Sequence, residues 1–375
     1  MQGLVLDYLQ YHPTLGADVR LARRGALIGR ATIGAHGSFG DYATVRADGE
    51  SIRVGARAWF GEHATVHIAD QVLGAVIGDD VTVGRYGLVH ACTLGDGVVV
   101  GESSVVMDGA TVGACALIAA DSVVPPRKSL PGGFVYAGHP AKPVRAIDRG
   151  ELAEQARALR GGRSAPLTAS SRLPPWLDVV GVLPERSGRI LHALDGRSPR
   201  IAGAYVAPTA ILAGDVAVAD DSGVFFGCAV HAGDGRIVIG PRTNVQDNSI
   251  LATDRRRGEL VLGAGVTIGH NVQMGSATIG DDALIGMGAR VADEVVVEQG
   301  ACIAAGAWVE PGTRVPAGWI WAGRPARAFR ELKSAERDDF ARARDIYVGY
   351  SGDYRRGLPA GREAAIARSA TPPAR

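Results

Sequence analysis

The stretch LGDGVVVGESSVVMDGATVGACALIAADSVV, residues 94–124, repeats one pattern every six positions. Each unit carries one regularly placed aliphatic residue, usually followed by glycine or another small residue. A period of six fits neither an α-helix, with 3.6 residues per turn, nor a long alternating strand. It fits a coil of three short strands with a tight turn at each corner, in which the aliphatic side chains point inward. These residues are Leu94, Val100, Val106, Val112, Ile118 and Val124.

The same period begins near residue 33 and returns between Ile239 and Val309. The segment AGHPA at 137–141 matches AGRPA at 322–326, which lies 185 positions later, and this offset holds without a gap from at least residue 46. The chain is therefore a tandem duplication. The pattern resembles the hexapeptide-repeat, left-handed parallel β-helix family. We expect an all-β solenoid of two left-handed parallel β-helix domains, each followed by an α-helix.

Segments between and after the repeats complete the predicted organisation. Leu152, Ala156 and Leu159 recur at helical spacing, and the stretch RSAPLTASSRLPP at 163–175 has the composition of a linker. The Gly-, Pro- and Arg-rich end of the chain is typical of disorder. The predicted parts are a first β-helix domain at 1–147, a helix and Ser/Pro-rich linker at 148–183, a second β-helix domain at 184–330, a C-terminal helix at 331–350 and a disordered tail at 351–375.

The composition is that of an ordinary globular protein. Hydrophobic residues make up 46% of the 375 positions, and 40 basic against 39 acidic residues leave a net charge of +1. No global field favours nucleic acid or an acidic membrane, and neither a signal peptide nor a long apolar run is present, so we expect a cytoplasmic protein. The cysteines are expected to be small buried residues rather than ligands or disulfides; they are Cys92, Cys115, Cys228 and Cys302.

Two histidines of the first copy fall on adjacent coils. The six-residue step from Val66 to Ile77 is lengthened by five, which indicates an outward loop. Without that loop, Val66 and Val89 lie one full coil apart, so the histidines that follow them, His67 and His90, should stack about 5 Å apart. Two imidazoles at this separation can bind one metal ion. A catalytic zinc site has three protein ligands and an open position, so one ligand is missing from this face.

A family resemblance supplies the third ligand. The string NVQDN at 244–248, the G-H-x4-H spacing, the AGxPA closure and the C-terminal helix together resemble the γ-class carbonic anhydrases. In that family the metal lies between subunits of a trimer, and one subunit donates a histidine to its neighbour's pair. At the donated position the first copy has Arg85, whereas the second copy has His270. The second copy has Ala252 and Gly275 where the first has His67 and His90, so one interface would assemble His67, His90 and His270.

Four more residues match family positions that lie near the metal. Arg46 and Asp48 form the R-x-D pair of the first copy, and Gln246 and Asp247 belong to the NVQDN string of the second. The resemblance implies an interface role for the first pair and a place near the reacting water for Gln246. The alternatives are a structural ion pair for Arg46 and Asp48, and turn capping for Gln246 and Asp247. Nearby, His63 is expected to be a surface histidine or, less simply, a proton shuttle.

The resemblance implies a metalloenzyme. A zinc, iron or cobalt ion on three neutral imidazoles would activate a water as hydroxide. The substrate would be carbon dioxide or bicarbonate, or an organic acid or carbonyl compound that undergoes the same chemistry. A hexapeptide-repeat acyltransferase with a histidine base is a second possibility. A catalytically inactive scaffold or assembly protein is a third.

Assembly stays open at this point. We expect a homo-oligomer with pseudo-trimeric packing of β-helices, because the resemblance implies threefold rings. Two homotypic rings stacked on each other would keep His270 away from His67. A heterotypic ring of both copies, or pairing of the two copies within one chain, would bring these residues together.

Overall fold

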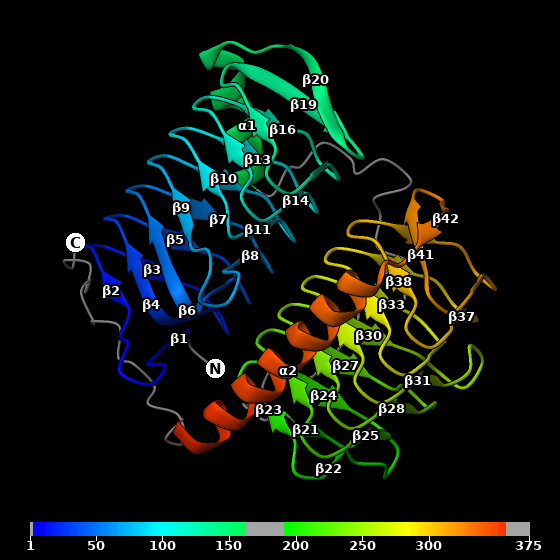
Figure 1. Cartoon of the computed structure of the whole chain (residues 1–375). Coiled ribbons are helices and arrows are strands. Elements are labelled where there is room, and N and C mark those ends of the chain that lie inside the picture. The colour runs from blue at the N-terminus through cyan, green and yellow to red at the C-terminus, as the bar shows by residue number, and fades with distance from the viewer. Residues whose placement is uncertain (1–2, 162–190, 358–375) are drawn as a thin grey trace.

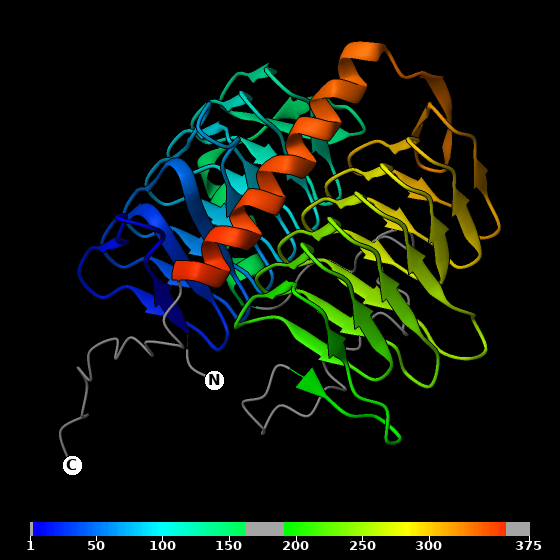
Figure 2. The same ribbon diagram turned by 60° about the horizontal axis from the view of Figure 1, so that its bottom comes forward.

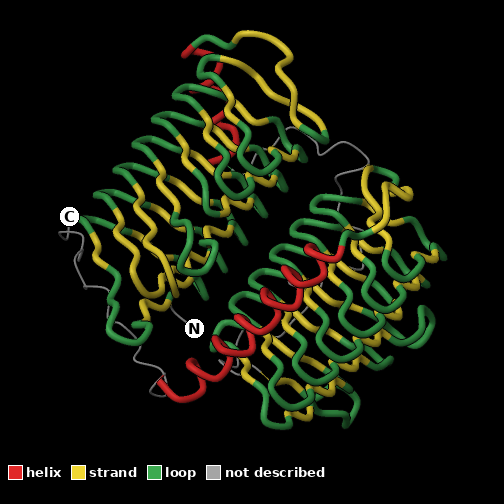
Figure 3. Tube along the Cα trace, in the orientation of Figure 1, coloured by secondary structure: helices red, strands yellow, loops and turns green. Residues whose placement is uncertain are grey.

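Two parallel β-helices lie side by side in this computed structural model, which describes residues 3–161 and 191–357 (Figure 1). Short strands recur on each coil and stack into long sheets (Figure 3). The predicted Ser/Pro-rich linker at 163–175, the start of the second domain at residue 184 and the tail beyond residue 357 lie outside the described residues. Neither of the two described helices combines the length and apolar character needed to cross a membrane.

The strands of the first β-helix form two sheets. The twelve-stranded sheet wraps two sides of the coil and contains β1 (Leu4–Leu6), β2 (Thr14–Leu15), β4 (Ala26–Ile33), β6 (Thr44–Val54), β8 (Thr65–His67), β9 (Ala75–Ile77), β11 (Leu88–His90), β12 (Thr93–Leu94), β14 (Val105–Val106), β15 (Thr111–Val112), β17 (Val123–Val124) and β18 (Ser129–Leu130). The eight-stranded sheet contains β3 (Arg20–Leu21), β5 (Ser38–Phe39), β7 (Trp59–Phe60), β10 (Thr82–Val83), β13 (Val99–Val100), β16 (Leu117–Ile118), β19 (Phe134–Gly138) and β20 (Ala141–Ala146).

The described part of the second β-helix has three sheets. The first contains β21 (Leu191–His192), β24 (Ile211–Ala213), β27 (Ala229–His231), β30 (Ile250–Ala252), β33 (Gln273–Met274), β36 (Arg290–Val291) and β39 (Trp308–Val309). The second contains β22 (Arg200–Ile201), β25 (Val216–Val218), β28 (Ile237–Ile239), β31 (Leu260–Leu262), β34 (Ala277–Ile279), β37 (Val295–Val297) and β40 (Arg314–Val315). The third contains β23 (Tyr205–Val206), β26 (Gly223–Val224), β29 (Asn244–Val245), β32 (Thr267–Ile268), β35 (Leu284–Ile285), β38 (Cys302–Ile303), β41 (Trp319–Gly323) and β42 (Ala326–Glu331).

The six-residue period determines both the core and the corners. The aliphatic residues from Leu94 to Val124 that define the period are all at most 1% exposed. Ser103, Gly109 and Cys115, which are six positions apart, have φ values of 54°, 68° and 58°. Such a left-handed residue turns the chain sharply, and a small side chain lowers its steric cost. The predicted all-β solenoid with two β-helix domains is confirmed.

Each β-helix is followed by one helix. α1 (Arg149–Arg160) begins after Asp148, whose carboxylate accepts a hydrogen bond from the Glu151 amide at 2.9 Å. α2 (Ser334–Gly357) packs on β23, β26 and β29 (Figure 2). It also reaches the first domain at the interface between the two domains, which is called the seam. The predicted boundaries of the second helix, residues 331 and 350, are both wrong.

The helix starts later because β42 continues to Glu331, and it runs seven residues further because its last turns are anchored. Tyr354 is 2% exposed, and its hydroxyl donates to Asp48 at 3.0 Å. Residues 351–357 are therefore ordered helix rather than the disordered tail expected for them. This anchoring also joins the second domain's helix to the first domain.

Stacked aromatic side chains at the corners of the first domain line the seam. His63 stacks between Tyr42 and Tyr86, with ring centroids 4.6 and 4.8 Å apart, and its Nδ1 lies 3.0 Å from the Asn248 side-chain oxygen. At 3% exposure it is not the surface histidine that we expected. The sequence could not reveal this, because the residues that bury His63 come partly from the other domain.

The buried His63 predicts a pH-dependent loss of stability. Burial lowers its pKa to about 4, against about 6.5 in an unfolded chain. The folded state therefore resists protonation, so the stability is complete above about pH 6.5 and is lost as the pH falls toward 4. Between about pH 7.5 and about pH 5, the wild type should lose about 2 kcal/mol more unfolding free energy than His63→Asn, measured by urea unfolding.

Asparagine is the residue that the second domain has at the equivalent position, Asn248. The matched control is His36→Asn, on the exposed surface of the same domain, and it should keep the wild-type pH dependence. Equal pH dependence in wild type and His63→Asn would contradict this prediction.

Candidate metal centre

His67 and His90 end adjacent strands of the first domain. β8 and β11 pair in parallel, with His67 directly opposite His90. Nδ1 of His67 lies 3.1 Å from Nε2 of His90, and the two residues are 2% and 8% exposed. The predicted stacking of these two histidines on one edge is present in the structure. One coil spans 23 positions here because it includes the loop after His67. The two residues therefore lie opposite each other on neighbouring strands.

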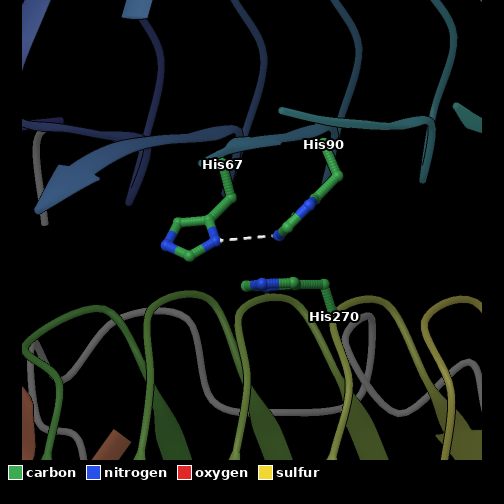
Figure 4. Close-up of side chains that lie close together, drawn as sticks. All are labelled: His67, His90 and His270. Carbon is green, nitrogen blue, oxygen red and sulfur yellow. Dashed lines mark hydrogen bonds between the residues drawn. The ribbon is translucent and has the colours of Figure 1, made fainter. Parts of the chain in front are cut away.

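His270 reaches the same place from the second domain (Figure 4). It stands at the corner after β32 and is fully buried. Its ring centroid lies 4.6 Å from that of His67 and 5.4 Å from that of His90. One nitrogen of each histidine lies within 4.8 Å of the others. Of the arrangements left open by the sequence, pairing within one chain therefore brings the three histidines together.

Each of the three histidines faces one carboxylate. Nε2 of His67 lies 3.2 Å from Asp48, Nδ1 of His90 lies 2.5 Å from Asp108, and Nδ1 of His270 lies 3.1 Å from Asp247. The His270 contact is close but poorly aligned for a hydrogen bond. Carboxylates on the outer nitrogens of metal-binding histidines fix the tautomer and the ring orientation.

The electrostatics favour neutral imidazoles, the form that binds metals. Burial, with a smaller contribution from Arg46, lowers the pKa of His67 well below its usual value. Burial likewise lowers the pKa of His270 to about 4. Burial alone would raise the pKa of Asp247, but Arg46 and His270 bring it down to about 2. The donor set, its protonation and its carboxylate partners thus fit one divalent metal ion.

Arg46 connects both domains beneath the histidines. It has no exposed side-chain surface, and its Nε donates to Asp247 of the second domain at 2.8 Å. A second guanidinium nitrogen donates to Asp48, and Nη2 donates to the Tyr347 hydroxyl at 3.0 Å. The predicted pair of Arg46 and Asp48 is thus present, and it extends to Asp247. The guanidinium holds two of the carboxylates that face the histidines.

The NVQDN string has both structural and site contacts. Besides Arg46, Asp247 accepts a hydrogen bond from the Phe226 amide at 3.0 Å, which is a corner-capping contact. Gln246 lines the same cavity as His67 and His90, and its amide nitrogen donates to Asn244 at 3.1 Å. Asp247 thus caps a corner and also lies at the site. The Gln246 side chain is held by Asn244 and lines the cavity.

The residues that occupy the complementary positions stay outside the cluster. Arg85 is half-buried and donates to Glu102 at 2.7 Å. Ala252 is 2% exposed and pairs with His231 across adjacent strands. Neither side chain takes part in the cluster of His67, His90 and His270.

Two contacts of the site were missed from the sequence. Asp108 lies one position beyond Met107, the residue that the register of β11 and β14 places opposite His90, so the stepping alone does not point to it. Tyr347 on α2 lies with its hydroxyl 3.1 Å from Nε2 of His270. It lies within the predicted C-terminal helix, but a helical prediction cannot say what the helix covers.

Known proteins support a family assignment. No family model matches the chain. Carbonic anhydrase from Geobacillus kaustophilus is 37% identical over 170 residues, which cover 45% of this chain and 92% of that protein. The chain belongs to the γ-carbonic anhydrase family. "Gamma carbonic anhydrase 1, mitochondrial" of Arabidopsis thaliana is 40% identical over 138 residues, 36% of this chain, and the chain spans only 50% of that relative's length.

A solved structure supports the two-domain architecture. A protein from Desulfovibrio desulfuricans G20, provisionally assigned as an acetyltransferase, matches with a TM-score of 0.61 over 94% of this chain and 83% of that chain. At 15% identity this match shows the fold alone.

The contact between His90 and Asp108 predicts a specific role for a carboxylate outside the histidine cluster. Asp108→Asn should weaken zinc binding roughly 10- to 100-fold, because the amide cannot hold the His90 ring by a charge-assisted bond. Competition with a fluorescent zinc chelator measures the affinity directly. The matched control is Asp338→Asn on the exposed surface of α2, which should keep wild-type affinity. Equal affinities in both variants would rule out this role.

Proposed function

We propose that this protein is a metal-dependent lyase of the γ-carbonic anhydrase type, with one composite site per chain. The proposal depends on one observation: three buried histidines from two domains converge within 4.8 Å, and each faces a carboxylate. His67, His90 and His270 would hold a single zinc, iron or cobalt ion. The reaction supported best by the family is the interconversion of carbon dioxide and bicarbonate. When bound, such an ion lowers the pKa of water toward neutrality and so supplies a nucleophile.

The residues around the histidines would hold the imidazole rings in position. Asp48, Asp108 and Asp247 would hold the three rings in the ligand tautomer, and Arg46 would neutralise and fix two of these carboxylates. Tyr347 contacts His270 and also lines the cavity, which gives access to His67 and His90. We assign Gln246 to orienting the reacting water or carbon dioxide, because its side chain lines this cavity and is fixed by Asn244.

Among the described residues, the site does not favour the alternatives. A hexapeptide acyltransferase needs a histidine free to act as a base, whereas His67, His90 and His270 all share partners within one cluster. A scaffold that had lost its chemistry would not need three buried histidines that each face a carboxylate. Oligomerisation through further β-helix faces stays a prediction.

Metal analysis tests the composite site. We expect about one zinc, iron or cobalt ion per purified chain, and its loss in both His67→Ala and His270→Ala, since either change leaves two ligands. The control is His36→Ala, whose side chain is 58% exposed and distant from the cluster in the fold, and it should keep the metal. Full occupancy in His270→Ala would contradict a site shared by the two domains.

The same proteins test the activity. Stopped-flow hydration of carbon dioxide should be catalysed by the wild type and by His36→Ala, and should fall to the uncatalysed rate in the two cluster variants. A fully loaded wild-type protein that leaves carbon dioxide unchanged would contradict the carbonic anhydrase reaction. The metal site itself would still stand in that case.

A further inference from the structure

A cavity of about 760 Å³ opens above the histidine cluster. His67 and His90 form part of its floor, the second domain forms one wall, and α2 forms another. Carbon dioxide has only three heavy atoms, whereas cavities of roughly 300–1,000 Å³ bind drug-sized molecules. The space beside the candidate metal centre is therefore much larger than the reaction of carbon dioxide requires.

The cavity is lined mainly by apolar side chains from three parts of the chain. Met107 comes from the first domain, Leu284 and Met287 from the second, and Phe340 and Ile346 from α2; all five are half-buried and none is fully packed away. At the rim, the loop after His67 places Val72 in solvent with 84% exposure. Apolar surface that is left uncovered beside a polar site indicates a ligand with an apolar body.

The charged groups of the lining are already paired. Asp108 bonds His90, and Asp70 accepts a hydrogen bond from Tyr350 at 2.7 Å. Arg342, the single cation among the described lining residues, lies 2.5 Å from Asp339. Away from the histidines, a charged group on the ligand would have to break one of these pairs or lose its own hydration, whereas an uncharged body would not.

We infer that this cavity binds a carbonyl compound with an uncharged, apolar aliphatic or aromatic body, its carbonyl group directed at the histidines. The assignment rests on the proposed function, because the metal centre at the floor is what makes this cavity a substrate site. It adds to that function a substrate class larger than carbon dioxide.

A ketone series tests the inference without relying on turnover. Binding of 2-pentanone, 2-heptanone and 2-nonanone to the metal-loaded protein is measured by isothermal titration calorimetry. The affinity should rise roughly fourfold per added methylene, because each one leaves water for the apolar walls. Affinity that is independent of chain length would overturn the inference.

A matched pair of variants locates the binding site. Ala343→Trp places an indole in the cavity from α2 and should weaken 2-nonanone binding at least about tenfold, because it fills the apolar volume. Ala335→Trp places the same residue on the exposed part of α2, outside the cavity lining, and should bind like wild type. If Ala343→Trp fails to fold, Met287→Trp blocks the cavity from the second domain. Equal binding in the cavity-filling and control variants would overturn the inference.

Metal content and carbon dioxide hydration are measured on the same preparations. If these are intact but ketones bind no better with length, the cavity inference fails and the proposed function stands. If the wild type binds ketones in the cavity but holds no metal, the proposed function fails. Cavity binding without metal would also remove the claim that the ligand is a substrate.

Discussion

The buried ion pairs of Arg46 join the domains and the candidate metal centre. Its guanidinium, with no exposed surface, contacts Asp48 of its own domain and Asp247 of the other. An unpaired buried charge is strongly destabilising, so Arg46 is fully compensated only when both domains are in place. The same two carboxylates face His67 and His270. Domain pairing and the orientation of the histidines therefore depend on one charge network.

Duplication explains how each copy could lose part of a site without losing the whole. Residues 185 positions apart meet at the seam: His63 contacts Asn248, and Asn271 donates to the carbonyl oxygen of Tyr86 at 3.3 Å. In a ring of identical subunits, each residue would have to suit both sides of every interface. Two linked copies form one seam of their own, so each position can specialise for its side. The histidines show the same specialisation, because the first copy keeps His67 and His90 and the second keeps His270.

Local periodicity made the coils, their register and the first two histidines predictable, because each depends on residues within one copy. The six-residue step places His90 over His67 whatever surrounds them. The third histidine needed the family resemblance, since no spacing within the first copy refers to His270. The same stepping places Met107, and not Asp108, opposite His90. It also could not reveal the burial of His63 or the extension of α2. Those features depend on which surface of the second domain meets the first, which a linear pattern does not encode.

The helix α2 makes the cavity a property of the paired domains. It belongs to the second domain, but the hydroxyls of Tyr350 and Tyr354 bond Asp70 and Asp48 of the first. These two contacts hold the wall formed by Phe340 and Ile346 over the histidines. Separated domains would lose the third histidine and one wall of the cavity at once, and the second domain would also lose the first-domain side chains Leu6, Tyr8 and Ile28 that pack in its core. Metal binding and recognition of an apolar ligand should therefore appear and disappear together with the seam.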